Sequence, residues 1–206
     1  MGSNLKRKSR IIIEKNGVNM KILYENTEAP INRVWVTFPL NENDAVKQML
    51  ALTKGHKAES SITYRIADID SPVRNLKKYL VADMPFDKLN ELAIKIREMD
   101  KEDWLKFSGV LDCKSISGME DVLGAAEDIE SYEFISSVTS NRELGGYLVQ
   151  QGFLECPKHI LPYLDYCGIG EEYYADHDCI FMKEGFIVRK ESCQTMETGH
   201  THTIQI

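Results

Sequence analysis

The sequence predicts an α+β fold with antiparallel sheets, because its first and last thirds mix strand and helix patterns while its middle third is helical. Alternation of apolar and polar residues indicates the strands, and a 3.6-residue apolar period indicates the helices. The turn signal Asn16-Gly17 lies between two apolar segments and favours a hairpin, which is antiparallel. A chain of 206 residues can form one domain or two to three small ones.

The first third is expected to hold short strands and one helix. The expected strands are residues 11–14, 20–24, 34–38 and 62–66. Pro39 ends the third of these strands, and Ser71-Pro72 ends the fourth. Between them, Asn41 or Asn43 can cap a helix that continues to about Thr53.

The middle of the chain shows the clearest helical period. One apolar stripe is formed by Leu89, Leu92, Ala93, Ile96 and Met99, after a capping residue at Asp87. A second short helix contains Trp104, Phe107 and Leu111. Ser117 and Glu120 have the spacing of a capping box and predict the start of a third helix.

The last third is mixed again. A strand is expected over residues 132–137, a helix over 141–151 with Gly152 just past its end, and a short helical turn within 157–166. Two further strands, 179–182 and 186–189, flank Glu184-Gly185. The tyrosines at helical spacing are expected to form a buried stripe or a dimer seam; they are Tyr163, Tyr166, Tyr173 and Tyr174.

The net charge of −7 is distributed unevenly. Residues 1–16 sum to +4 and residues 184–206 to −1, so residues 17–183 carry −7 − 4 + 1 = −10. Between Lys114 and Arg142 there are six carboxylates and no basic residue. Such a run is typical of a solvated helix face. It also suits a surface that repels nucleic acid and attracts proteins built to hold nucleic acid, so the folded body is not expected to bind nucleic acid directly.

Several classes of function are disfavoured. No apolar run approaches the roughly 20 residues of a membrane span, so a cytoplasmic protein without membrane contact is expected. The five cysteines are irregularly spaced, which argues against a disulfide framework. A zinc site could be assembled from Cys156, His159, His177 and Cys179, but the usual C-x-x-C pair is missing. Phosphate-binding loops and nucleophile elbows are absent, and a hidden acid or Cys/His site stays open as an enzymatic alternative.

An ordered set of motifs resembles the ArdA antirestriction proteins. Residues 34–40, VWVTFPL, resemble the family's first signature strand, and residues 64–72, YRIADIDSP, its next strand. Residues 89–92 resemble its leucine-asparagine helix. Residues 144–148, followed by Pro157, residues 163–166 and Gly170, resemble its C-terminal signature. The order and spacing hold over about residues 20–188.

The resemblance implies a particular architecture and activity. Members of the family are elongated rows of three small domains that mimic bent B-form DNA, dimerise through their C-terminal domains and occupy the DNA groove of type I restriction-modification enzymes. No catalytic residue, metal or cofactor is implied, because surface carboxylates stand in for phosphates. The partner-binding acids that match the family's acidic stretches are Glu120, Asp121, Glu127, Asp128, Glu130, Glu133, Asp165, Glu171 and Glu172.

The expected organisation follows this pattern. It comprises a basic extension (1–17), an N-terminal β/α domain (18–73), a helical middle domain (74–116), a C-terminal α+β domain (117–190) and a flexible tail (191–206). The chain departs from the family in its basic extension and in the Lys and Arg residues that make the first two domains less acidic. An alternative function is therefore an acidic interaction protein on the same fold that binds another basic partner from a mobile element, without DNA mimicry.

Overall fold

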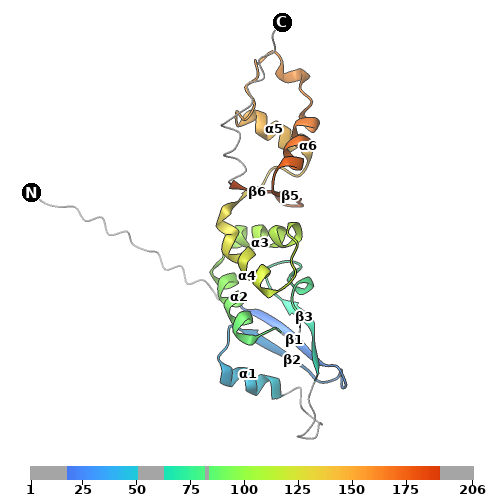
Figure 1. Cartoon of the computed structure of the whole chain (residues 1–206), viewed down its shortest axis with the longest axis vertical. Coiled ribbons are helices and arrows are strands. Elements are labelled where there is room, and N and C mark those ends of the chain that lie inside the picture. The colour runs from blue at the N-terminus through green and yellow to red at the C-terminus, as the bar shows by residue number, and fades with distance from the viewer. Residues whose placement is uncertain (1–17, 51–62, 82–83, 191–206) are drawn as a thin grey trace, which may run out of the picture.

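A computed structural model of the chain describes residues 18–50, 63–81 and 84–190. The molecule is elongated, with one sheet in its N-terminal half, the other near its middle, and helices between the sheets and beyond them (Figure 1). The strands are β1 (Met20–Asn26), β2 (Arg33–Phe38), β3 (Tyr64–Asp70), β4 (Tyr132–Ile135), β5 (Cys179–Met182) and β6 (Gly185–Arg189). The α-helices are α1 (Glu42–Met49), α2 (Phe86–Glu98), α3 (Lys101–Cys113), α4 (Met119–Glu127), α5 (Asn141–Gln150) and α6 (Tyr166–Asp176). Single 3-10 turns are η2 (Leu76–Lys78), η3 (Asp128–Ser131) and η4 (Leu161–Tyr163). The predicted α+β class with antiparallel sheets is confirmed.

The first sheet has the order β2-β1-β3, with β1 antiparallel to both neighbours. Period-two alternation turns one side of β1 and β2 into the core; these residues are Met20, Ile22, Tyr24, Val36 and Phe38. Phe86, the first residue of α2, stacks on Phe38 at 5.8 Å between ring centroids and so covers this side of the sheet. The predicted strands at 20–24 and 34–38 are confirmed. The predicted strand at 11–14 and its Asn16-Gly17 turn lie outside the described residues.

The helices of the middle third largely follow the predicted periods. All residues of the α2 stripe are buried, from Leu89 to Met99. Asp100 caps α3 in a capping box with Asp103, whereas the capping box expected at Ser117 and Glu120 is wrong. There, α4 begins one residue later, and the backbone N–H and hydroxyl of Ser117 both donate to the carboxylate of Asp121 at 2.8 and 2.7 Å. Asp87 lies inside the first turn of α2 rather than capping it.

The second sheet has the order β4-β6-β5 and is also antiparallel. It sits between α3 on one side and the pair α5 and α6 beyond it (Figure 1). The predicted strands at 132–137, 179–182 and 186–189 are confirmed, the first in a shorter form. The helix expected at 141–151 is α5, and Gly152 follows it with a φ of +82°, a left-handed conformation that favours glycine. Helix α6 was not predicted as an element.

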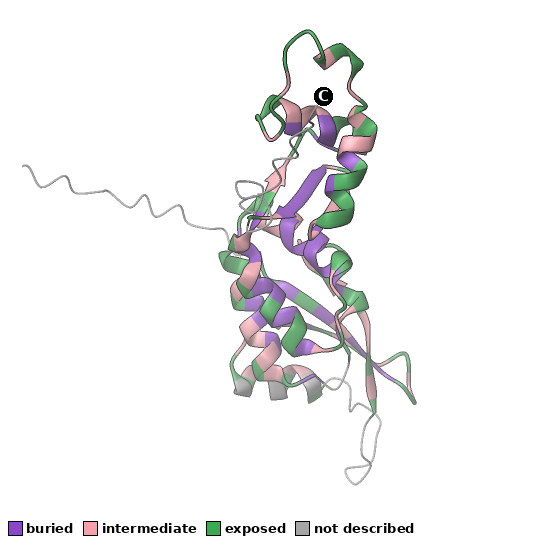
Figure 2. Cartoon of the chain, turned by 45° about the horizontal axis from the view of Figure 1, so that its top comes forward, coloured by how far each residue is buried: buried purple, intermediate pink, exposed green. Residues whose placement is uncertain are grey.

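Two hydrophobic clusters form the interior, and the buried residues line the inner sides of sheets and helices (Figure 2). The larger cluster joins the first sheet to α2, α3 and α4 and reaches Ile187 of β6. The smaller cluster joins α5 and α6 to the other part of the second sheet. The larger core contains residues from both sides of the expected boundaries at 73/74 and 116/117, and the division into three domains stays a prediction.

Candidate acidic interaction surface

The nine acids singled out from the sequence lie on or at the start of four elements of the fold. Glu120, Asp121 and Glu127 belong to α4, Asp128 and Glu130 to η3, and Glu133 to β4. The remaining three, Asp165, Glu171 and Glu172, lie at the start of α6 and within it. All except Asp128 are exposed. The structure therefore places two acidic groups along the length of the molecule, one near its middle and one toward the C-terminal end (Figure 1).

The outward position of the α4 acids follows from the apolar residues between them. Met119, Val122, Leu123 and Ala126 are buried in the larger core. Because residues of one helix alternate between faces with a period of 3.6, burying these four turns Glu120, Asp121 and Glu127 toward solvent. The predicted inward and outward faces of this helix are confirmed.

Two of these acids have basic partners that the local sequence does not contain. Lys88 of α2 lies 3.4 Å from Glu120, and Lys95 of α2 lies 3.0 Å from Glu127. The absence of Lys and Arg from residues 115–141 therefore does not leave a surface without counter-charge. Both pairs are exposed at the carboxylate, so solvent screens them and they contribute little to the stability of the fold.

Asp128 is a structural carboxylate rather than a free surface charge. It accepts hydrogen bonds from Ser131 at 2.7 Å and Lys114 at 3.3 Å, and from Arg189 of β6 at 3.1 Å. Lys114 also lies 5.4 Å from the ring centre of Tyr132, so the cluster ties the end of α3 to the second sheet. The hydrogen bond from Ser131, with the charges of Lys114 and Arg189, holds the pKa of Asp128 below its usual value.

Replacing Asp128 by Asn should destabilise the protein at neutral pH by about 1–3 kcal/mol, because Lys114 and Arg189 lose their shared charged acceptor. The pKa of Asp128 is depressed in the folded state, so its contribution is present above the unfolded pKa and is lost as pH falls through the folded pKa. Urea denaturation of both proteins at pH 7 and near pH 3 measures the difference, which should shrink at the lower pH. Glu130→Gln, an exposed neighbour, is the control and should change stability by less than about 0.5 kcal/mol.

Two further acids hold local backbone structure. Asp121 accepts both hydrogen bonds of Ser117, which lower the pKa of its carboxyl. Asp165 caps α6 by accepting from the backbone N–H groups of Cys167 and Gly168, each at 3.1 Å. Among the ion pairs of the described residues, none involves Glu130, Glu133, Glu171 or Glu172. These four carboxylates are exposed, and Glu171 also accepts a hydrogen bond from the thiol of Cys167 at 3.5 Å.

A model of the antirestriction protein (ArdA) family matches residues 27–188. The chain belongs to the ArdA family of antirestriction proteins. Comparison with curated proteins gives no significant match. The matched segment covers every helix and all strands except β1, which precedes it, and the last residue of β6, and the ArdA resemblance inferred from the motifs is confirmed.

The ArdA motifs occupy defined positions in this fold. The VWVTFP motif forms β2 and the turn after it, with Trp35 44% exposed on the outer side of the first sheet. The paired glycines of the C-terminal motif lie in α5, where Gly145 packs against the backbone of Tyr166 and Gly146 has no atom within 4 Å of an added Cβ. Close helix packing thus explains Gly145 but not Gly146. Among the tyrosines at helical spacing, Tyr173 is buried whereas Tyr163 is 84% exposed.

The residues weighed for metal binding do not come together in this ArdA chain. Within the described residues there is no group of three or more His, Cys, Asp or Glu side chains that could hold a metal ion. Cys179 is buried, and its thiol donates a hydrogen bond to the carbonyl oxygen of Tyr174. The thiol of Cys156 donates a hydrogen bond to the carbonyl oxygen of Pro157. No helix in the described part of the chain is long and apolar enough to cross a membrane.

Asp176 lines a hollow between α6 and the C-terminal end of α5 and is not among the nine acids singled out from the sequence. Asp176 is exposed and follows Glu172 by one helical turn on α6. The signal that could have found it is the i, i+4 spacing of the two acids, but that spacing has meaning only once residues 166–176 are recognised as a helix.

Proposed function

We propose that this protein inhibits type I restriction-modification enzymes by occupying their DNA-binding groove as a mimic of B-form DNA. The observation that carries the proposal is the series of exposed carboxylates along an elongated, net-acidic molecule of the ArdA family. A groove that holds DNA is lined by basic side chains, and a rigid row of carboxylates can satisfy them as phosphates do. No covalent chemistry and no cofactor are needed for such an inhibitor.

The distribution of basic residues supports this proposal. Lys and Arg residues reduce the net negative charge of the first two-thirds of the chain. Most of those that the structure describes are held in ion pairs within the molecule. These pairs are Arg65–Glu25, Arg74–Glu184, Lys77–Asp68, Lys78–Asp112, Lys88–Glu120, Lys95–Glu127 and Lys106–Asp103. Their charge is therefore compensated locally, whereas five carboxylates on η3, β4 and α6 take part in none of the ion pairs between described residues; they are Glu130, Glu133, Glu171, Glu172 and Asp176.

The test is restriction of unmodified plasmid DNA by a purified type I enzyme in the presence of increasing amounts of the protein. Inhibition should be competitive with DNA, and the enzyme should form a stable complex with the protein. As a control, a variant without the basic residues 1–16 should show no tight, salt-dependent binding to duplex DNA at physiological salt. Inhibition that persists at saturating DNA would contradict the proposed groove occupancy.

A second function is favoured by the pairs of Lys88 and Lys95 with α4, which reduce the charge of the acidic surface. In this alternative the protein binds another basic protein of a mobile element and does not imitate DNA. The two proposals differ in one result. The alternative predicts no competition with DNA on any type I enzyme, while a complex with a different basic protein still forms.

We further propose that the protein forms a homodimer through its C-terminal part. Large apolar side chains are exposed there, namely Leu154, Ile160, Tyr163 and Tyr174. A two-fold pair would also double the length of the acidic molecule. Aromatic residues are enriched in interfaces of this kind, and Tyr163 is the most exposed of the four at 84%.

Tyr163→Asp should therefore weaken the dimer by about tenfold or more, since it places a charge at an apolar contact. Light scattering over a range of protein concentrations measures the change in dissociation constant. Ile31→Asp is the matched control, because Ile31 is 91% exposed but lies in the N-terminal sheet region, and it should leave the dimer unchanged. A monomer for the wild-type protein at micromolar concentration would contradict the proposed dimer.

A further inference from the structure

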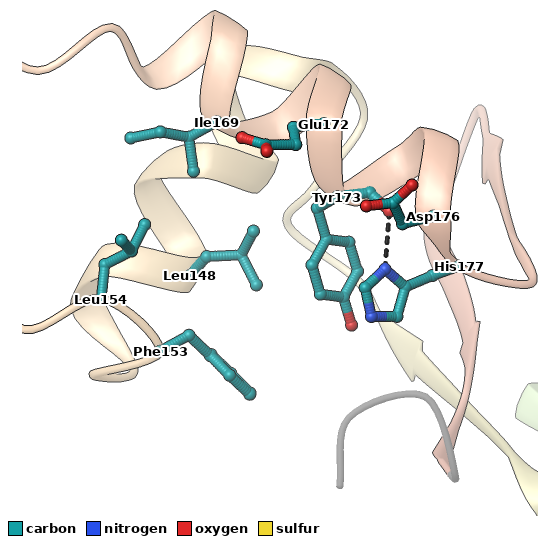
Figure 3. Close-up of a pocket in the computed structure, with 8 residues that line it drawn as sticks. All are labelled: Leu148, Phe153, Leu154, Ile169, Glu172, Tyr173, Asp176 and His177. Carbon is teal, nitrogen blue, oxygen red and sulfur yellow. Dashed lines mark hydrogen bonds between the residues drawn. The ribbon is translucent and has the colours of Figure 1, made fainter. Parts of the chain in front are cut away.

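A hollow of about 270 Å³ lies between α6 and the C-terminal end of α5. Helix α6 contributes one face to it, at the spacing i, i+3, i+4, i+7 and i+8; these residues are Ile169, Glu172, Tyr173, Asp176 and His177. The opposite wall comes from the end of α5 and the turn after it and consists of Leu148, Phe153 and Leu154 (Figure 3).

The inner part of the hollow is apolar and firmly built. Leu148 and Tyr173 belong to the smaller core and are only 3% and 4% exposed. The ring of His177 is stacked on that of Tyr173 at 3.8 Å between centroids, and its Nδ1 lies 2.8 Å from the carbonyl oxygen of Tyr173 (Figure 3). Leu154 is 44% exposed and stands at the open side. The wall is therefore preformed rather than dependent on a ligand for its shape.

The outer part carries negative charge without a nearby compensating cation. Glu172 and Asp176 are exposed, lie one helical turn apart, and take part in none of the ion pairs between described residues. Among the residues that the structure describes, no Lys or Arg lines the hollow. Its volume lies just below the roughly 300–1,000 Å³ of sites for drug-sized ligands, which suits one amino-acid side chain. The expected occupant is thus an apolar stem that ends in a cation.

We propose that this hollow binds an arginine side chain of a protein partner. The aliphatic stem would lie along Leu148, Leu154 and Ile169, and the guanidinium would lie between the carboxylates of Glu172 and Asp176. The proposal rests on the proposed function only for the identity of the protein that supplies the arginine, because a DNA-binding groove is rich in this residue. It adds one discrete anchor to a surface that otherwise acts through summed charge.

Arginine fits this site better than lysine for three physical reasons. Its guanidinium is less strongly hydrated than an ammonium group and loses less on leaving water for a half-apolar hollow. Its planar group also packs on aromatic rings, and both Phe153 and Tyr173 line the hollow. In addition, the N–H donors of its planar guanidinium can form hydrogen bonds to two carboxylates at once, whereas an ammonium is a compact point charge.

The site can be tested on the full-length protein without any restriction enzyme. The probe is N-acetyl-arginine methylamide, added to ¹⁵N-labelled protein while backbone amide shifts are recorded by NMR. Saturable shifts should be confined to residues 148–154 and 169–177. The lysine analogue should bind several-fold more weakly, and the uncharged citrulline analogue should not bind. Shifts spread evenly over all acidic segments, or equal shifts with citrulline, would overturn the proposal.

Matched variants separate the hollow from general charge. Glu172→Gln/Asp176→Asn should weaken binding of the arginine probe about tenfold or more, because both charged acceptors are lost. Glu133→Gln/Glu171→Gln removes the same charge at exposed positions that do not line the hollow and should change it less than twofold. Leu154→Ser tests the apolar wall at an exposed position and should weaken the probe several-fold. Equal losses in the two double variants would overturn the proposal.

The inhibition assay then distinguishes this inference from the proposed function. If the protein inhibits a type I enzyme, Glu172→Gln/Asp176→Asn should reduce inhibition more than Glu133→Gln/Glu171→Gln. Probe binding without inhibition would support the hollow and contradict the proposed function. Inhibition with no probe binding by the wild-type protein would support the function and overturn the arginine site. A hollow covered by a second copy of the chain would give probe binding only in the monomeric Tyr163→Asp variant, and this result would also overturn it.

Discussion

Gly145→Ala should destabilise the protein by about 1–3 kcal/mol or more, because the added methyl group meets the backbone of the neighbouring helix. A Cβ at this position of α5 would fall far inside contact distance of the carbonyl oxygen of Tyr166, at the start of α6. The obstructing atom belongs to the backbone, so the two helices would have to move apart. Thermal and urea denaturation measure the effect, which should be strongest in probes of the C-terminal part.

The neighbouring glycine supplies the control for this substitution. Nothing lies within 4 Å of a Cβ added at Gly146, and alanine is favoured over glycine inside a helix by about 1 kcal/mol. Gly146→Ala should therefore leave stability unchanged or raise it. Equal destabilisation by both substitutions would show that the helix contact is not the cause.

A second close approach lies at the other end of the same helix contact. A Cβ at Gly170 of α6 would overlap the carbonyl oxygen of Asn141 at the start of α5. Both glycines serve the same contact between α5 and α6, and helices already separated by one methyl group can accommodate a second. The loss of unfolding free energy in Gly145→Ala/Gly170→Ala should therefore be smaller than the sum of the losses in the two single variants.

This contact also explains why α6 could not be predicted from the sequence. The α2 stripe was predictable because Leu89, Leu92 and Ile96 repeat with the helical period and all face one large core. In α6, the buried positions are Gly170 and Tyr173, so the face that packs is defined largely by the absence of a side chain. Glycines in a segment usually indicate a turn, and only the approach of α5 makes them part of a helix.

The acidic site was predictable in its position but not in its pairing. Helical periodicity places Glu120 and Glu127 on the outer face of α4, and the structure has them there. Their partners, Lys88 and Lys95, lie 32 residues away in the sequence on a separate helix. Asp128 meets Arg189 across 61 residues for the same reason. Such pairs depend on the packing of separate elements, which no local pattern contains.

Neutralising three carboxylates together should reduce inhibition of a type I enzyme by about 100-fold at low salt. The variant is Glu130→Gln/Glu133→Gln/Glu171→Gln, which removes exposed charges that hold no ion pair between described residues. One exposed charge at about 4 Å from a partner group contributes about 1 kcal/mol in water, so three contribute about 3 kcal/mol. Titration of the enzyme with each variant measures the inhibition constant, and the difference should shrink as added salt screens the charges.

Two control variants distinguish summed charge from a discrete site. Glu130→Asp/Glu133→Asp/Glu171→Asp keeps the charge while shortening the side chains, and it should retain most of the inhibition. Glu133→Gln alone should reduce inhibition by less than about tenfold, because a summed field loses only one of many contributions. Stability should be almost unchanged in all three variants, since the acids are exposed. If Glu133→Gln alone abolished inhibition while fold and dimer persisted, inhibition would depend on a discrete site, and mimicry through summed charge would be the wrong account of this ArdA protein.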